Sequence, residues 1–317
     1  MLPLLAALLL LPDANAAACS CSRSVALPSG NLTRAWALIA GFDYGVNMEG
    51  DPQLWRGFYV KDRYGDSMPG MYMPPMLVQN FALGVSLGLP AHFSLSTTLP
   101  YMYKDNLMYR NVDDLPLMPG DEDLASFNDV DLTAKWGYKS KDMGTFFGVG
   151  AGVTFPTGTV SVGSPVRSGR GVFGGTASAN AGTKLSPHVG IAAQVSGSMG
   201  FGADKTGYVV APMASLVAGA RWSPRENGKL SIALFGIERW TGQDKLTFEG
   251  QTQELVYKNS GSIGTDLGAA LAYTFWAKDV RSAGFSLRAQ APVLQIVGDP
   301  MYAQNFGGAA SITWTAL

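Results

Sequence analysis

The sequence predicts an all-β fold, an antiparallel transmembrane β-barrel of about 12 strands. Two observations lead to this prediction. Apolar and polar residues alternate with a period of two in segment after segment, and the connections between the segments alternate between short and long. The alternation is typical of a sheet with one apolar and one polar face. The loop asymmetry is typical of a barrel whose strands cross a membrane back and forth.

The alternation is clearest between residues 77 and 138. From Leu77 to Leu89 every second residue is large and mostly apolar, whereas the residues between them are small or polar. The pattern returns in residues 93–103 and again in 129–138, where polar residues such as Asp131 lie opposite an apolar stripe. Because successive side chains of a strand point to opposite faces, we expect lipid on one side of this sheet and water on the other.

About twelve segments show strand patterning between turn signals. They are residues 33–46, 76–89, 93–103, 129–139, 144–156, 172–185, 189–201, 208–222, 229–240, 262–276, 284–297 and 303–316. Short connections, such as 90–92 and 186–188, alternate with mostly longer ones, such as 47–75 and 104–128. Bacterial outer-membrane barrels have short periplasmic turns and longer external loops, so we expect both termini on the periplasmic side.

Aromatic residues should gather near the strand ends, because their rings prefer the two interfaces of a membrane. At the ends next to long loops the sequence places Tyr44, Tyr101, Tyr103, Tyr208 and Trp240. At the ends next to short turns it places Trp136, Tyr138, Trp222, Tyr273, Phe275 and Phe285.

The N-terminus predicts export from the cytoplasm. Residues 2–11 form an apolar run that is too short to span a bilayer, and Ala14-Asn15-Ala16 resembles a signal-peptidase site. We therefore expect a signal peptide at 1–16, a periplasmic segment at 17–32 and an outer-membrane barrel at 33–317. A buried helix of a soluble protein is the alternative interpretation of the apolar run.

The two cysteines, Cys19 and Cys21, follow directly after this segment. Their spacing is too short for a comfortable disulfide. Lipidation of Cys19, a two-thiolate metal site, and an inert or intermolecular pair all remain open, although two sulfur ligands make only half of a tetrahedral site.

Composition excludes several functions. A net charge of −1 with 15% charged residues argues against a nucleic-acid-binding protein. Hydrophobic residues reach 47%, yet no run after residue 16 approaches the roughly 18 residues of a membrane helix. The 39 glycines suit curved, crowded sheets.

Two motifs that suggest catalysis are expected to be coincidental. The G-x-S-x-G pattern at 84–88 lies inside a strand rather than at a strand-to-helix turn. The G-x-G-x-x-G pattern at 169–174 leads into another strand rather than a helix. His92 and His188 fall in separate short turns. We therefore expect no catalytic residues, no metal and no cofactor.

The alternation assigns side chains to the two faces. The residues expected to face lipid are Leu83, Val85, Leu95, Leu99, Leu132, Ala134, Leu267 and Leu271. The residues expected to face the lumen are Asp129, Asp131, Lys135, Asn180, Lys184, Asp266, Arg288 and Gln290. The charges in the second set balance, three carboxylates against three cations.

The predicted loop 104–128 is acidic. Its acidic residues include Asp113, Asp114, Asp121, Glu122 and Asp123. A solvated surface loop is the simpler interpretation, and an external lip that attracts cations is the functional one.

Several stretches resemble a known family. They are residues 81–101, ending in Leu-Pro-Tyr; 128–138, beginning with Asn-Asp-Val-Asp-Leu; 147–158, ending in Phe-Pro-Thr-Gly; and 290–293. Together they are similar to a transporter-like family of outer-membrane β-barrels named for the meta-pathway of phenol degradation. The chain departs from the family pattern at Asn128, where glycine is usual, and at Leu317, where an aromatic residue is common.

The resemblance implies an outer-membrane channel that passes small, hydrophobic or aromatic organic compounds passively. The alternative is a structural or assembly barrel with a plugged lumen. The partners expected for either are membrane lipid, lipopolysaccharide, the barrel assembly machinery and, for a channel, small solutes; no nucleic acid is expected.

Overall fold

The computed structural model describes residues 36–50, 59–62, 76–106, 124–140, 144–159, 168–205, 207–225, 229–242, 245–247, 254–256, 262–278, 281–297 and 303–316. In these residues the secondary structure is β-sheet joined by turns, which confirms the all-β prediction. None of them belongs to a helix that is long and apolar enough to cross a membrane.

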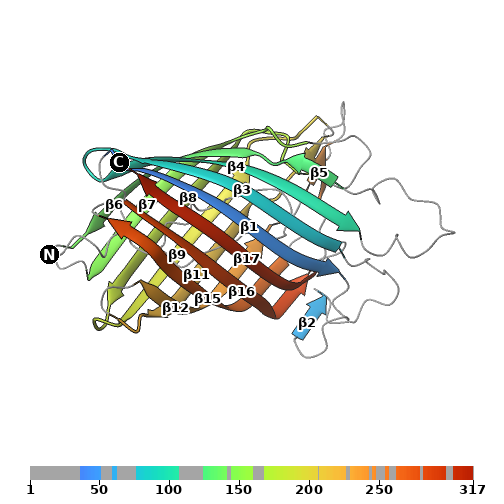
Figure 1. The fold of residues 1–317 in the computed structure, drawn as a ribbon. Helices are drawn as coiled ribbons and strands as arrows, with labels where there is room; N and C mark the ends of the chain where they lie inside the picture. The colour runs from blue at the N-terminus through green and yellow to red at the C-terminus, as the bar shows by residue number, and fades with distance from the viewer. Residues whose placement is uncertain are drawn as a thin grey trace.

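Twelve long antiparallel strands within the described residues form a closed barrel (Figure 1). They are β1 (Leu38–Gly50), β3 (Met76–Gly88), β4 (Phe93–Asn106), β6 (Val130–Lys139), β7 (Thr145–Phe155), β8 (Gly174–Lys184), β9 (Val189–Gly200), β11 (Met213–Trp222), β12 (Leu230–Thr241), β15 (Ser262–Lys278), β16 (Arg281–Val297) and β17 (Ala303–Ala316). Each pairs with its neighbours in chain order, and β1 pairs with β17 to close the sheet.

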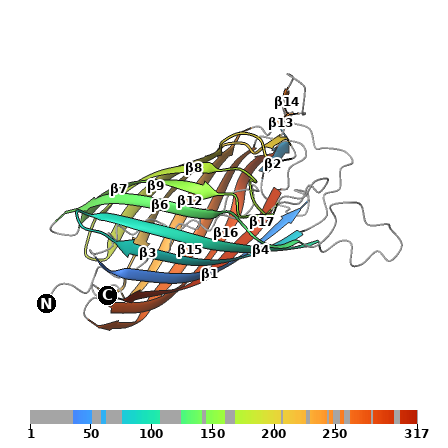
Figure 2. The same ribbon diagram turned by 90° about the horizontal axis from the view of Figure 1, so that it is seen from above.

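Short strands gather at the end of the barrel that carries the long connections, opposite the end at which β1 begins and β17 ends (Figures 1 and 2). There, β2 (Tyr59–Asp62) pairs parallel with β16, and β5 (Leu124–Phe127) pairs with β4. A separate small sheet contains β10 (Tyr208–Val209), β13 (Lys245–Thr247) and β14 (Glu254–Val256). We call this end of the barrel the outer end and the opposite one the short-turn end.

The predicted strands match the observed ones closely, with two differences. The first strand begins at Leu38 rather than at residue 33, and it continues to Gly50. The predicted strand 208–222 is interrupted, because Tyr208 and Val209 pair with β13 and the barrel strand begins only at Met213. Pro212 lies at the break, where its missing N–H group could not have joined a sheet ladder.

The two faces of the barrel differ in burial and polarity. In β6, Asp131 and Thr133 are buried, whereas Leu132 and Ala134 are exposed. The exposed face carries large apolar side chains all around the sheet, among them Leu234, which is 66% exposed. Of the residues predicted to face lipid, all are exposed except Val85, which is half-buried. An apolar outer surface of this kind is stable only against lipid or detergent.

Aromatic rings pair at both ends of the exposed face. At the outer end the ring centroids of Tyr101 and Phe127 are 5.3 Å apart. At the short-turn end, Trp136 and Phe147 are 5.4 Å apart, and Trp276 and Trp314 are 5.6 Å apart. Two aromatic belts mark the interfaces of a membrane-spanning barrel. Tyr208 was wrongly assigned to the barrel wall, since it belongs to β10 in the separate small sheet.

The two-faced sheet predicts unequal losses of stability when a charge is placed at two positions of β3 that face opposite sides. Leu83 is 51% exposed and lies on the apolar face, whereas Ser86 lies on the other face. Leu83→Arg should lower the free energy of unfolding in lipid vesicles by about 2–4 kcal/mol, because a charge in mid-membrane is poorly solvated. Ser86→Arg is the matched control and should cost much less. Equal losses in denaturant titrations would mean that the strand register is wrong.

Candidate functional site

The buried face of the barrel is lined with polar side chains, and this lining is the candidate functional site. Among the residues predicted to face the lumen, Asp129, Asp131, Asp266, Arg288 and Gln290 are buried. Lys135, Asn180 and Lys184 are half-buried and lie on the same, less exposed face of their strands.

Further charged residues lie on this lining that sequence reasoning missed. They are Asp43, Lys104, Lys139, Arg170, Arg221 and Arg239. The expected balance of three carboxylates to three cations therefore does not hold, because cations predominate among the described residues. Lys139 could have been found from the sequence, since it is four residues beyond Lys135 on the same side of a strand.

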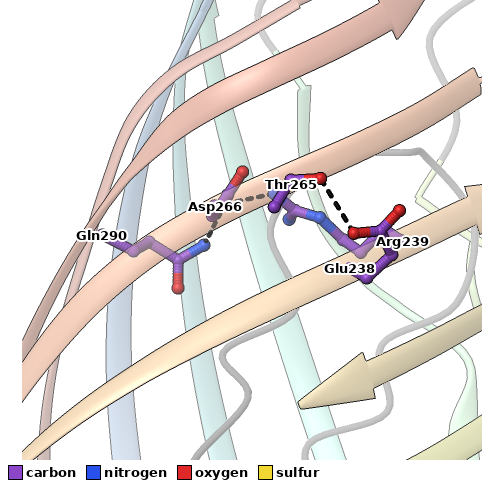
Figure 3. Close-up of polar contacts among 5 residues, drawn as sticks. All are labelled: Glu238, Arg239, Thr265, Asp266 and Gln290. Carbon is purple, nitrogen blue, oxygen red and sulfur yellow. Dashed lines mark hydrogen bonds and ion pairs between the residues drawn. The ribbon is translucent and has the colours of Figure 1, made fainter. Parts of the chain in front are cut away.

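A first polar cluster joins β12, β15 and β16 (Figure 3). The Arg239 guanidinium forms an ion pair with the Asp266 carboxylate, and the Gln290 side-chain amide donates a hydrogen bond of 2.9 Å to the same Asp266 oxygen. Asp266 is fully buried, and its other carboxylate oxygen has no hydrogen-bond partner in the described structure. On the opposite face of the sheet, Thr265 donates a hydrogen bond of 2.8 Å to Glu238.

A β-bulge positions Asp266. Thr265 pairs with Leu294 whereas Asp266 pairs with Pro292, so that Val293 is an extra residue in β16. Proline has no N–H group to donate to a neighbouring strand. A bulge interrupts the hydrogen-bond ladder, so Pro292 can lie here without leaving a required donor missing. Bulges redirect side chains locally, which is consistent with Asp266 reaching partners on both neighbouring strands.

A second cluster joins β1, β16 and β17. Asp43 accepts a hydrogen bond from Ser311 and is attracted electrostatically by Arg288. The hydroxyl groups of Ser286 and Ser311 are 2.7 Å apart. These residues follow one row across the sheet, since Asp43 pairs with Ser311 and Ser311 with Ser286.

A third cluster lies at the outer end, around Asp129. The Asp129 carboxylate accepts hydrogen bonds from the backbone N–H groups of Gly158, at 2.9 Å, and Arg170, at 2.6 Å. The Arg170 guanidinium donates to Ser198 Oγ at 2.9 Å. Asp129, Gly158, Gly169 and Arg170 make up what we call the Asp129 cluster, which holds the two ends of the β7–β8 connection together.

Close packing explains the glycines of the Asp129 cluster. A Cβ atom on Gly169 would collide with the Asp129 carboxylate, and one on Gly158 would collide with the backbone of Gly169. Asp129 and Arg170 lie outside the strands. Burial raises the pKa of Asp129 and lowers that of Arg170, and the attraction between the two charges opposes both changes. The G-x-G-x-x-G pattern thus serves packing, and β8 rather than a helix follows it.

The wall formed by β7 to β9 carries mostly small side chains on its buried face, and we call it the thin wall. Neighbouring side chains crowd the space above Gly150 and Gly148: a Cβ atom would lie 3.0 Å from Ser178 Oγ at Gly150 and 3.0 Å from Asn180 Oδ1 at Gly148. The Ser178 and Asn180 side chains of β8, and the stem of Lys135 of β6, therefore lie across the glycines of β7. Gly148 and Gly150 carry no side chain of their own, whereas Phe146, nearer the short-turn end of the same face, packs its ring over Gly182.

The remaining sequence motifs contribute no site. Ser86 lies within β3, as expected, and His188 contacts the carbonyl oxygen of Ser223 through Nδ1 at 2.9 Å. The described residues contain no group of three or more His, Cys, Asp or Glu side chains that could hold a metal. Cys19, Cys21 and the acidic residues between 113 and 123 lie outside the described residues.

The Asp129 cluster predicts a large stability effect for one substitution. Asp129→Ala should lower the free energy of unfolding by about 3–5 kcal/mol, because it removes the larger of the two electrostatic attractions, from Asp129 and Asp131, that compensate the buried Arg170 charge. Ser186→Ala is the matched control, since Ser186 Oγ also accepts two backbone N–H groups but has no charged partner. It should cost about 1 kcal/mol. Similar losses for both variants in urea titrations would contradict the assigned role of the charge.

The Asp266 cluster predicts non-additivity. Asp266→Ala and Arg239→Ala should each cost about 3–5 kcal/mol, whereas the double variant should cost clearly less than their sum. A double-mutant cycle on Glu238 and Thr265, across the other face, should give a coupling below about 1 kcal/mol. Additive losses for Asp266 and Arg239 would show that the ion pair has no energetic weight.

Comparison with solved structures identifies the fold. An outer-membrane channel of Pseudomonas putida F1 matches with a TM-score of 0.70 and 13% identity, over 92% of this chain and 100% of that one. The translocator domain of the autotransporter NalP of Neisseria meningitidis matches with a TM-score of 0.43 and 10% identity, over 90% of each chain. The toluene transporter TodX of Pseudomonas putida matches with a TM-score of 0.39 and 9% identity, over 89% and 90%. The first match confirms a transmembrane β-barrel fold.

Comparison of sequences identifies the family. No curated protein matches the chain. A family model matches residues 75–291, which run from the start of β3 into β16 and make up more than half of the chain. The stretches that suggested the resemblance contact one another at the outer end, where the Thr157 hydroxyl donates 2.9 Å to the Asn128 carbonyl and Gly158 binds Asp129. The chain belongs to the family described by the words "MetA-pathway of phenol degradation".

Proposed function

We propose that this protein is a bacterial outer-membrane channel through which small, apolar or aromatic organic compounds pass by diffusion. One observation carries the proposal: the closed barrel has an apolar outer face with two aromatic belts and a polar lining. Hydrogen bonds and an ion pair cross-link this lining on one side, whereas the thin wall on the other side carries mostly small side chains. The family description names phenol degradation, which supports an aromatic solute. A solved structure with the same fold is described as an outer-membrane channel.

The passage runs beside β7, β8 and β9. The lining residues proposed to face it include Asp129, Asp131, Lys135, Asn180, Lys184, Asp266, Arg288 and Gln290. On the opposite side, Arg239, Asp266 and Gln290 are tied together by hydrogen bonds and an ion pair. Barrels of this strand number lie between small barrels filled by side chains and wide porins, so the free space should adjoin the thin wall.

The surroundings of the channel follow from its proposed location. Lipid surrounds the apolar belt, and lipopolysaccharide borders the outer aromatic belt. The barrel assembly machinery inserts the barrel into the membrane. The protein carries out no catalysis and needs no cofactor or metal. The acidic residues between 113 and 123 bias the outer entrance toward cations, and Cys19 is a candidate for lipidation.

A structural barrel with a plugged lumen is the second candidate. Its motivation is the Asp129 cluster, which brings the two ends of the β7–β8 connection together at the outer end of the barrel. A β7–β8 connection that covered the lumen would stop solutes, whereas one that followed the wall would leave room for them.

Flux measurements decide between the two. Purified protein in liposomes should admit phenol. Ser178→Trp, on the lining of β8, should block most of this flux, because the indole would fill the space beside the thin wall. Ala177→Trp is the matched control, since Ala177 is exposed on the opposite face of the same strand, and it should leave the flux unchanged. Absence of phenol flux through the unmodified protein would sink the channel proposal in favour of a plugged barrel.

A further inference from the structure

Three cations lie together on the lining at the short-turn end. Lys139 is the last residue of β6, Lys184 the last of β8, and Arg221 the last but one of β11. These three strands run in the same direction and are neighbours but for one intervening strand each, β7 and β9. Each side chain shares the less exposed face of its strand with the polar lining, and each is half-buried.

The cations are close enough to repel one another. Lys184 and Arg221 both act electrostatically on Lys139. Lys184 pairs with Gly190 of β9, and Gly190 pairs with Arg221, so the two cations flank one glycine in a single row. With about 4.8 Å between neighbouring strands, their backbones lie about 10 Å apart.

The position between the cations is open. A Cβ atom on Gly190 would meet only a backbone oxygen, that of Thr183, at 3.5 Å, and no side chain. The long side chains of Lys184 and Arg221 thus leave the glycine uncovered.

The strands around the cations supply no counter-ion. Strands β7, β8, β9 and β11 contain no Asp or Glu at all. Asp131 of β6 belongs to the opposite end of its strand, where Thr154 donates a hydrogen bond to it. Glu238 of β12 lies toward the outer end on the other face, where it binds Thr265.

We propose that Lys139, Lys184 and Arg221 form a binding site for a small organic anion, a carboxylate above all, centred over Gly190 at the periplasmic mouth of the barrel. A carboxylate there can accept hydrogen bonds from a Lys ammonium and an Arg guanidinium at once, and such charge-assisted hydrogen bonds are strong. The ring of an aromatic carboxylate would then lie along Gly190 and Ala192, beside the Phe146 ring that covers Gly182.

The site refines the proposed function, on which it rests, by naming the solute class. Aromatic acids are negatively charged at neutral pH, so the cations raise their local concentration at the periplasmic mouth relative to neutral phenols of the same size. The site would favour benzoate over phenol.

The test removes two of the cations and compares two readouts. The double variant K184Q/R221Q is compared with R225Q/R281Q, which removes two exposed cations near the same end of the barrel. Each protein is reconstituted for reversal potentials in a potassium chloride gradient and for fluxes of benzoate and phenol. A charge-preserving variant, K184R/R221K, reports on folding.

The ratio of chloride to potassium permeability, and of benzoate to phenol flux, should fall at least tenfold in K184Q/R221Q. Two unit charges about 5 Å from an anion each change its concentration about fourfold even at the dielectric constant of water. Both ratios should persist in R225Q/R281Q and in K184R/R221K. Unchanged ratios in K184Q/R221Q, with phenol flux intact, would overturn the anion site while leaving the channel in place. Absence of phenol flux in the unmodified protein would instead remove the proposed function, and equilibrium binding of benzoate to the detergent-solubilised unmodified protein and to K184Q/R221Q would still decide whether the anion site exists.

Discussion

Closure of the sheet is the constraint on which the rest of this structure depends. In hydrocarbon every backbone N–H and C=O group has to find a partner within the protein, because an unpaired group costs several kcal/mol. The first and last long strands satisfy this requirement by pairing from Leu38 with Ala316 to Gly50 with Ala303. Once the sheet is closed, its exposed face has to be apolar, and the residues that alternate with it are enclosed together.

Enclosure gives the lining its character. Charged groups that leave bulk water require partners, and on the side formed by β12, β15, β16 and β1 the partners lie on neighbouring strands, as with Asp266 and Arg239. The side formed by β7 to β9 carries mostly small residues and no carboxylates, so these strands offer no counter-ion to Lys184. The proposed passage and the proposed anion site both result from this asymmetry. One half of the lining has charged groups cross-linked between strands, and the other half has mostly small side chains and no carboxylates.

The strand pattern was predictable from sequence because a period of two leaves a direct signature. Prediction failed where that signature ended. Arg170 comes from a connection and reaches Asp129 through a backbone N–H group, a contact that leaves no pattern in the sequence. Glu238-Arg239-Trp240 places polar residues on both faces of β12, so alternation alone could not assign Arg239 to the lining. Tyr208 and Pro212 looked like a continuation of a strand, and only the pairing of β10 with β13 shows the break.

The fold is tested most directly by measuring the environment of side chains on the two faces of the barrel. Nitroxide spin labels attached at Leu99 and Thr98, which are neighbours on β4 with 44% and 5% exposure, should report different surroundings in lipid vesicles. The label at 99 should collide with dissolved oxygen, which concentrates in lipid, and the label at 98 should collide with a water-soluble nickel complex. Equal accessibility of both labels to the same reagent would contradict a barrel with lipid outside and a hydrated passage inside.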